Sequence, residues 1–247
     1  MSLVQPHIRC SEDLKVKYAI LPGDPKRVDR IAEFLENVEE VEFNREYKSL
    51  VGYYKGIKIL AMSTGMGGAS TGIAVEELKN IGVEVLIRIG SCGANQEGIK
   101  LGDLIIPNGI VRDDGASRAY VEEKYPAVPD TELLFEITNS AKKQGFSYHI
   151  GIARSHDSFY TDEEEAIDSY WSKKGILGAD MESSALFVIG ALRGLKTASI
   201  LNVVVEMDGN LGEDINNYVD GENGTLDGEK KEILTALEAV YEYNNKI

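Results

Sequence analysis

Cysteine, positive charge and long apolar runs are all scarce in this chain of 247 residues. Its two cysteines, Cys10 and Cys92, have neither C-x-x-C spacing nor a neighbouring histidine pair, which argues against a disulfide framework and a zinc site. The 26 basic side chains are outnumbered by 41 acidic ones, and the net charge of −15 argues against a nucleic acid polymer as ligand. No apolar run approaches the ~18 residues of a membrane span, and no signal peptide opens the chain. We therefore expect a soluble, cytoplasmic protein.

Apolar runs that predict strands alternate along the chain with patterns that predict helices. The predicted strands are Tyr18–Leu21, Leu50–Tyr54, Ile57–Ser63, Val83–Ile89, Asp103–Ile106 with Ile110–Val111, Tyr148–Ala153 and Thr197–Val205. Helices are predicted after Asp24, after the turn Gly65–Gly68, and over Glu182–Leu192 and Gly228–Tyr243. The alternation is typical of a three-layer α/β/α fold with a mixed, largely parallel sheet. Residues 1–247 are predicted to form one domain, with a polar surface loop over Asp208–Gly228.

Two predicted strands end beside arginines and glycines, where ligands of open α/β sheets bind. After the first, Gly23 permits close approach to a ligand, the following helix directs its free N–H groups there, and Arg27 can reach an anion. Near the end of another lies Arg88, followed by Ser91; a buried arginine is costly unless it meets an anion or a carboxylate. An ordinary turn and a structural ion pair are the alternative interpretations.

A third junction, Asp180-Met181-Glu182-Ser183, supplies a carboxylate where the chain enters a predicted helix. A carboxylate accepts two hydrogen bonds at once, so Glu182 can hold a vicinal diol such as the O2′ and O3′ hydroxyls of ribose. The alternative is a helix-start glutamate that the helix dipole favours.

Taken together, these stretches resemble the nucleoside phosphorylase superfamily of uridine phosphorylase, the hexameric purine nucleoside phosphorylases and the methylthioadenosine nucleosidases. The matching stretches, in chain order, are Leu21–Arg27, Asn44–Tyr47, Ser63–Gly68, Arg88–Ser91, Arg112–Ser117, Tyr125–Val128 and Asp180–Ser183. Each is moderately specific alone, but the ordered set covers nearly the whole chain.

The resemblance implies phosphate-dependent cleavage of a nucleoside with no organic cofactor. The phosphate site would comprise Gly23, Arg27, Arg88 and Ser91, with Arg45 from a neighbouring subunit. Met181 and Glu182 would hold the ribose, together with His7 of the neighbour. Glu182, Arg88 and Arg27 would carry catalysis, and relatives of the uridine type imply a monovalent cation at Glu46, the Met66 backbone and Ser70. The implied assembly is a homo-oligomer, a hexamer built as three dimers.

Residues at the expected base pocket favour uridine. The implied wall is Cys92, Gly93, Phe159, Val204 and Val205. Purine enzymes place an aspartate where Val204 or Val205 falls, whereas uridine enzymes have apolar residues there. The chain departs from the uridine pattern because Glu163 and Glu165 stand where those enzymes read uracil with Gln and Arg.

A purine nucleoside phosphorylase acting on inosine or guanosine is therefore the alternative, with Glu206 or Asp208 as its purine-facing acid. A hydrolase of the same superfamily is disfavoured, because water as the nucleophile needs no set of three arginines.

Overall fold

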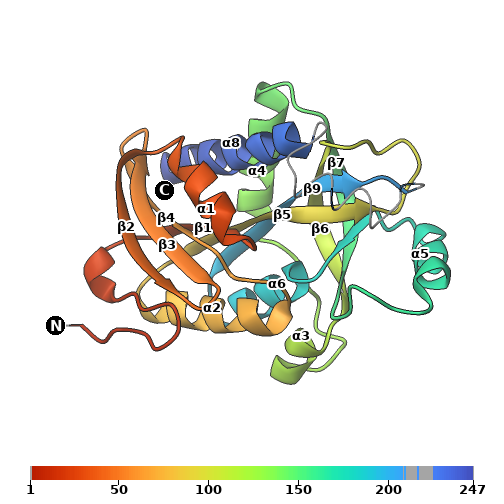
Figure 1. The fold of residues 1–247 in the computed structure, drawn as a ribbon, viewed down its shortest axis with the longest axis horizontal. Coiled ribbons are helices and arrows are strands. Elements are labelled where there is room, and N and C mark those ends of the chain that lie inside the picture. The colour runs from red at the N-terminus through yellow and green to blue at the C-terminus, as the bar shows by residue number, and fades with distance from the viewer. Residues whose placement is uncertain (1, 208, 210–215, 217–224, 247) are drawn as a thin grey trace.

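The computed structural model describes residues 2–207, 209, 216 and 225–246. Within these residues nine strands form one sheet in the order β2-β3-β4-β1-β5-β8-β7-β6-β9 (Figure 1). The strands are β1 Tyr18–Pro22, β2 Glu36–Asn44, β3 Tyr47–Tyr54, β4 Ile57–Met62, β5 Val85–Ala94, β6 Leu104–Asp113, β7 Tyr148–His156, β8 Gly178–Asp180 and β9 Lys196–Val205. The helices are η1 Glu12–Leu14, α1 Pro25–Ala32, α2 Gly68–Asn80, α3 Gly115–Tyr120, α4 Thr131–Lys143, α5 Glu164–Ser172, α6 Ser183–Leu192 and α8 Thr225–Asn244. None of the helices described is long and apolar enough to cross a membrane.

Strand β5 is the centre of the sheet because it pairs with three neighbours. It runs parallel to β1 and β9 and antiparallel to β8 near its carboxyl end. The pairing with β9 closes β5, β8, β7, β6 and β9 into a ring, while β2, β3, β4 and β1 extend from it as an open sheet. The predicted mixed, largely parallel α/β sheet is confirmed; its partial closure was not foreseen.

Helices cover both faces of the sheet and enclose two apolar clusters. One face carries α1, α4 and α8, and the other carries α2, α3 and α6 (Figure 1). Successive side chains of β5 serve the two clusters in turn: Leu86 joins the α2/α6 side, and Val85 and Ile87 join the α1/α4/α8 side. A strand buried on both faces reads as a continuous apolar run, which is why this one could be predicted.

Helix α1 begins as the sequence predicts. The Asp24 side chain accepts a hydrogen bond from the Lys26 N–H at 3.0 Å, and Pro25 occupies the first helical position. Val28 and Ile31 are fully buried against the sheet. This packing fixes the first turn, and with it Arg27, at the carboxyl end of β1.

Several elements were not predicted. Strand β2 is almost entirely exposed, so it lacks the alternation that marks a half-buried strand. Strand β8 has only three residues. Helix α4 did carry a signal, because Leu133, Ile137 and Ala141 recur every four residues and are buried. The predicted loop Asp208–Gly228 lies mostly outside the described residues, and α8 begins at Thr225 rather than Gly228.

Candidate active site

The ends of β1 and β5 and the start of α1 bring the first group of predicted residues together. The Arg27 guanidinium, 3% exposed, donates to the Ser91 hydroxyl at 3.2 Å and to the Ile89 carbonyl at 3.3 Å. A Cβ added to Gly23 would lie 4.0 Å from Nη1 of Arg88 and 3.2 Å from the Gly65 carbonyl oxygen. Gly23, Arg27, Arg88 and Ser91 therefore form one cluster within the chain.

Arg88 joins this cluster to the junction between β8 and α6. Its Nε donates to Asp180 Oδ2 at 3.0 Å, and its Nη2 forms an ion pair with Glu182. Burial alone would lower the pKa of the Arg88 guanidinium, but the carboxylates of Glu182 and Asp180 more than offset this and raise it. Its Nη1 is buried and has no hydrogen-bond partner among the described residues. A buried N–H without a partner is costly, so this donor suits a ligand.

Glu182 lies at the N-cap of α6, with only 5% of its surface exposed. Its carboxylate accepts hydrogen bonds from the Gly67 N–H at 2.6 Å and the Met181 N–H at 3.2 Å. Burial raises the pKa of Glu182; the charge of Arg88 opposes this rise and that of Asp180 adds to it. The Gly-rich turn before α2 and the start of α6 thus meet at one carboxylate.

Two acids of α8 face the arginine cluster, and sequence reasoning missed both. Glu229 accepts from Arg27 Nε at 2.9 Å, and Glu232 lies 3.3 Å from Arg27 Nη1 with no exposed surface. Burial raises the pKa of Glu232 to about 8, although Arg27 opposes the rise. The sequence did carry a signal for this pair. Glu229 and Glu232 are one helical turn apart, and Ile233 and Leu237 of the same helix are buried. The two central arginines are therefore surrounded by carboxylates.

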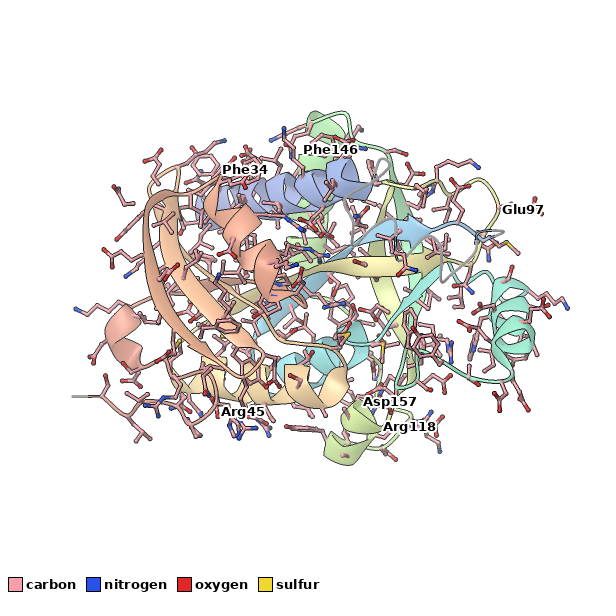
Figure 2. All side chains as sticks on the ribbon, in the orientation of Figure 1. Phe34, Arg45, Glu97, Arg118, Phe146 and Asp157 are labelled. Carbon is pink, nitrogen blue, oxygen red and sulfur yellow. The ribbon has the colours of Figure 1, made fainter. Side chains whose placement is uncertain are left out.

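Arg45 and His7 lie outside this cluster in the described chain. Arg45 is exposed at the tip of the β2–β3 hairpin with a φ of 56° (Figure 2). Within the described residues it forms no hydrogen bond or ion pair. His7 is held on α2, because Glu77 accepts from its backbone N–H at 3.0 Å and lies 2.6 Å from its Nδ1. Their assignment to a neighbour's site stays a prediction.

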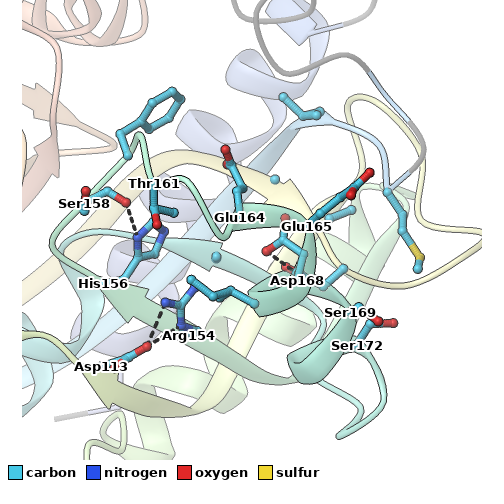
Figure 3. A pocket seen from close by; sticks show the side chains of 18 of the residues that line it. Asp113, Arg154, His156, Ser158, Thr161, Glu164, Glu165, Asp168, Ser169 and Ser172 are labelled. Carbon is cyan, nitrogen blue, oxygen red and sulfur yellow. Dashed lines mark hydrogen bonds and ion pairs between the residues drawn. The ribbon is translucent and has the colours of Figure 1, made fainter.

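A cavity of about 960 Å³ opens beside the junction of β5 and β8 (Figure 3). Of the predicted base-pocket residues, Gly93, Phe159 and Val205 line it. Cys92 and Val204 are buried, 3% and 1% exposed, and do not line it. Both belong to strands, where successive side chains point to opposite faces, and only their neighbours Gly93 and Val205 reach the cavity.

The remaining wall comes from α5, the segment before it, and the ends of β6 and β7. Glu165 lines the cavity, whereas its predicted companion Glu163 does not. Glu206 lines it too, but its carboxylate is bound by Lys100 Nζ at 2.8 Å and by the Leu101 N–H. Asp208, the other candidate acid, lies outside the described residues. Arg154 of β7, which sequence reasoning did not single out, is the buried cation of this wall.

The predicted cation ligands lie close together. The Ser70 hydroxyl donates to Glu46 Oε1 at 2.8 Å and also bonds to the Thr64 carbonyl. The hydrogen bond from the backbone N–H of Glu46 lowers the pKa of its carboxyl, so the group favours the charged form. Among the described residues no group of three or more histidine, cysteine and acidic side chains could hold a metal ion.

Comparison with known proteins defines the class. The sequence profile of the phosphorylase superfamily matches residues 17–235. The chain is 38% identical to a uridine phosphorylase of Thermococcus kodakarensis over 96% of this chain and 86% of that protein. It is 39% identical to a guanosine phosphorylase of Halorubrum lacusprofundi over 84% of both. A crystal structure of uridine phosphorylase from Vibrio fischeri covers 98% of each chain with a TM-score of 0.90 and 49% identity.

The fold and these matches define an enzyme of the pentosyltransferase class, as the sequence predicted. The chain belongs to the phosphorylase superfamily.

Proposed function

We propose that the protein cleaves uridine with inorganic phosphate and releases uracil and ribose 1-phosphate. The observation that carries the proposal is a pair of buried arginines, Arg27 donating to Ser91 and Arg88 ion-paired to Glu182. Strand β5, which carries Arg88 and Ser91, continues to Gly93, and Gly93 lines the cavity together with Val205 and Phe159. Two of the relatives described above are uridine phosphorylases.

The reaction is a displacement at the anomeric carbon. A phosphate oxygen forms a bond to C1′ as the C1′–N1 bond breaks, and the bonding electron pair leaves with the base. Arg27, Arg88 and Ser91 would orient the phosphate and offset its charge, an effect of proximity and electrostatics. Glu182 would hold the ribose hydroxyls and stabilise positive charge that develops at C1′. The Nη1 of Arg88 is the donor in this cluster best placed to bind phosphate.

The carboxylates around Arg27 and Arg88 bear on the assembly. Asp180, Glu182 and Glu229 are ion-paired with Arg88, Arg27 and Arg30, so these arginines keep little net positive charge and a doubly charged phosphate needs more. Arg45 of a neighbouring subunit would supply it from an exposed hairpin tip, and His7 of the neighbour would reach the ribose. We accordingly propose a homo-oligomer with shared sites, a hexamer of three dimers. Glu46, Ser70 and the Met66 backbone would provide half of a monovalent cation site between subunits.

Dependence on phosphate is the first test. Purified protein should release uracil from uridine when phosphate is present and should form an equal amount of ribose 1-phosphate. Cleavage at the same rate in phosphate-free buffer would identify a hydrolase and contradict the proposal.

The second test compares bases, because one relative is a guanosine phosphorylase. At saturating phosphate, uridine should react faster than inosine and guanosine, since Val205 offers no acid to a purine N7. If guanosine reacts a hundredfold faster than uridine, guanosine is the substrate instead. The acidic residues that line the cavity then become the candidates for binding the purine.

The third test addresses the shared site. Arg45→Ala and Glu182→Ala proteins should each be inactive, and mixing them under conditions of subunit exchange should restore part of the activity. One site of each mixed dimer then carries both defects and the other carries none. Full activity of a monomer, or no recovery after proven exchange, would show that each chain holds a complete site.

A further inference from the structure

A buried arginine forms part of the cavity wall on the side away from the phosphate cluster. Arg154 lies near the end of β7 with 7% of its surface exposed. Its neighbour Ser155 turns to the other side of the strand, where it bonds to Asp180 and to the Ser184 N–H. Alternation therefore sends Arg154 and His156 to the cavity side, toward the segment around Ser158 (Figure 3).

The Arg154 guanidinium is fixed along one edge. Its Nε and Nη2 bind Asp113 Oδ2 at 2.8 and 2.7 Å, and its central carbon lies 5.9 Å from the Trp171 ring centroid. Within the described residues its Nη1 forms no hydrogen bond or ion pair. The guanidinium is therefore oriented in advance, with one pair of N–H donors left for a ligand in the cavity that it lines.

The charges of the cavity indicate what this ligand is. Acidic side chains of the lining are Asp113, Asp157, Glu164, Glu165, Asp168 and Glu206. The cations of the lining are Arg154, which is buried, and Lys173, which is exposed. This excess of negative charge repels an anion, so a second phosphate is a poor ligand. A group that enters the cavity neutral and carries a polar carbonyl fits, because it accepts a hydrogen bond from the arginine. Negative charge that later develops on that oxygen lies beside Arg154, the buried cation of the wall.

We propose that Arg154 binds a carbonyl oxygen of the nucleobase and stabilises the leaving base; this rests on the proposed function. The electron pair of the breaking C1′–N1 bond moves into the uracil ring and is shared by O2 and O4. A proton from phosphate or water then neutralises the uracil anion. Arg154 stays protonated throughout and donates to the oxygen on which negative charge grows. The contact is to O4, because cytosine shares the carbonyl at position 2 but presents an amino group at position 4, and an arginine that donates to O4 therefore selects uracil over cytosine.

The test compares two substrates that differ in how well the base leaves. Arg154→Gln should lower kcat/KM for uridine by about 10²-fold, the scale of losing one preorganised donor, while KM for phosphate stays within about twofold. With 5-fluorouridine, whose fluorine already stabilises the anion, the loss should be about tenfold smaller. Asp113→Asn keeps Arg154 but removes the carboxylate that orients it, and should give a smaller loss with the same dependence on the leaving group.

Matched controls separate this role from a structural one. Arg118→Gln removes another arginine near Asp113, 3.8 Å away, and should leave both substrates within about twofold of wild type. Thermal melting of every variant checks the fold. The proposal would be overturned if Arg154→Gln lowered kcat/KM equally for both substrates, or lowered only the melting temperature. It would also be overturned if Lys173→Gln caused the loss in kcat/KM instead, or if the wild type preferred cytidine to uridine.

Failure of the proposed function is recognised before any variant is made, since the wild type would then not cleave uridine with phosphate. If it cleaves guanosine instead, Arg154→Gln is compared on guanosine and on 2-aminoadenosine, which lacks the O6 carbonyl. A larger loss on guanosine supports the carbonyl contact, and an equal loss refutes it.

Discussion

The phosphate side and the base side of the site are built in different ways. On the phosphate side, Arg27, Arg88 and Glu182 are each at most 5% exposed and come from the starts of helices and the end of a central strand. On the base side, most of the acidic residues of the wall lie on α5 and the segment before it, and Glu165 and Asp168 among them are exposed. Buried ion pairs tolerate little change, whereas exposed side chains tolerate much. Under the proposed function, residues of the core would therefore determine the reaction, and residues of the periphery would determine the choice of base.

The largest difference should appear when a buried arginine is removed. Arg88→Met leaves Asp180 and Glu182 buried without their cation, which should lower the free energy of unfolding by about 3–5 kcal/mol and abolish phosphorolysis. Urea unfolding and uracil release would measure both. Arg193→Met is the matched control, because its ion pair with Glu76 is exposed and worth about 0–1 kcal/mol. Equal losses for the two variants would remove the distinction between core and periphery.

Glu182→Gln should have the next largest effect. The substitution keeps the shape of the side chain but removes the charge that favours the transition state and grips the ribose hydroxyls. Turnover should fall by about 10²-fold or more, the scale of one preorganised electrostatic group. Steady-state kinetics with uridine would measure it, and a rate near that of wild type would exclude Glu182 from the mechanism.

Glu232→Gln should change how stability depends on pH. The pKa of Glu232 is raised from 4.5 to about 8 in the folded protein, so the folded state holds this proton more tightly than the unfolded chain does. Its contribution to stability is fully present below pH 4.5 and is lost as the pH rises through about 8.

The variant should therefore gain most over wild type at pH 8.5, by several degrees in melting temperature, and least at pH 5. Glu242→Gln is the control, because hydrogen bonding to Lys143 lowers the pKa of that surface carboxyl and its titration falls below this range. A gain that does not depend on pH would show that Glu232 is not the group that titrates.

The smallest effect is expected at Glu165. Its carboxylate is exposed, so Glu165→Gln should alter kcat/KM for uridine by no more than about twofold, with KM for phosphate unchanged. A hundredfold drop in kcat/KM for uridine would place a residue that binds the base on α5. The two sides of the site would then be equally intolerant of substitution.

This contrast also explains what could be predicted from the sequence. Arg27, Arg88 and Glu182 belong to short stretches in which a strand end, a glycine and a helix start are adjacent in the chain. The structure brings these three together. The base side is assembled from β6, from the stretch that contains β7 and α5, and from β9, three regions that are distant in sequence, and its acids carry no local pattern.

Two omissions have specific causes. Arg88 was singled out as an arginine near the end of a buried strand, and Arg154 satisfies the same criterion at the end of β7. It was missed because the predicted strand ended at Ala153, three residues before the observed end at His156, which left Arg154 just outside the strand. The closure of β5 onto β9 has no signal at all, because strand order depends on packing between distant segments.

Gly23 and Gly90 bear on how this site can change during evolution. A Cβ at Gly90 would lie 2.5 Å from Nη2 of Arg88, and one at Gly23 would come within 4.0 Å of Nη1. The guanidinium occupies space that a side chain at position 90 would otherwise fill. A side chain at position 90 would therefore have to displace the Arg88 guanidinium from its ion pairs with Asp180 and Glu182. The glycine at position 90 thus sets where the charge of Arg88 can lie, and a change there would act on the site through the arginine rather than through a new contact.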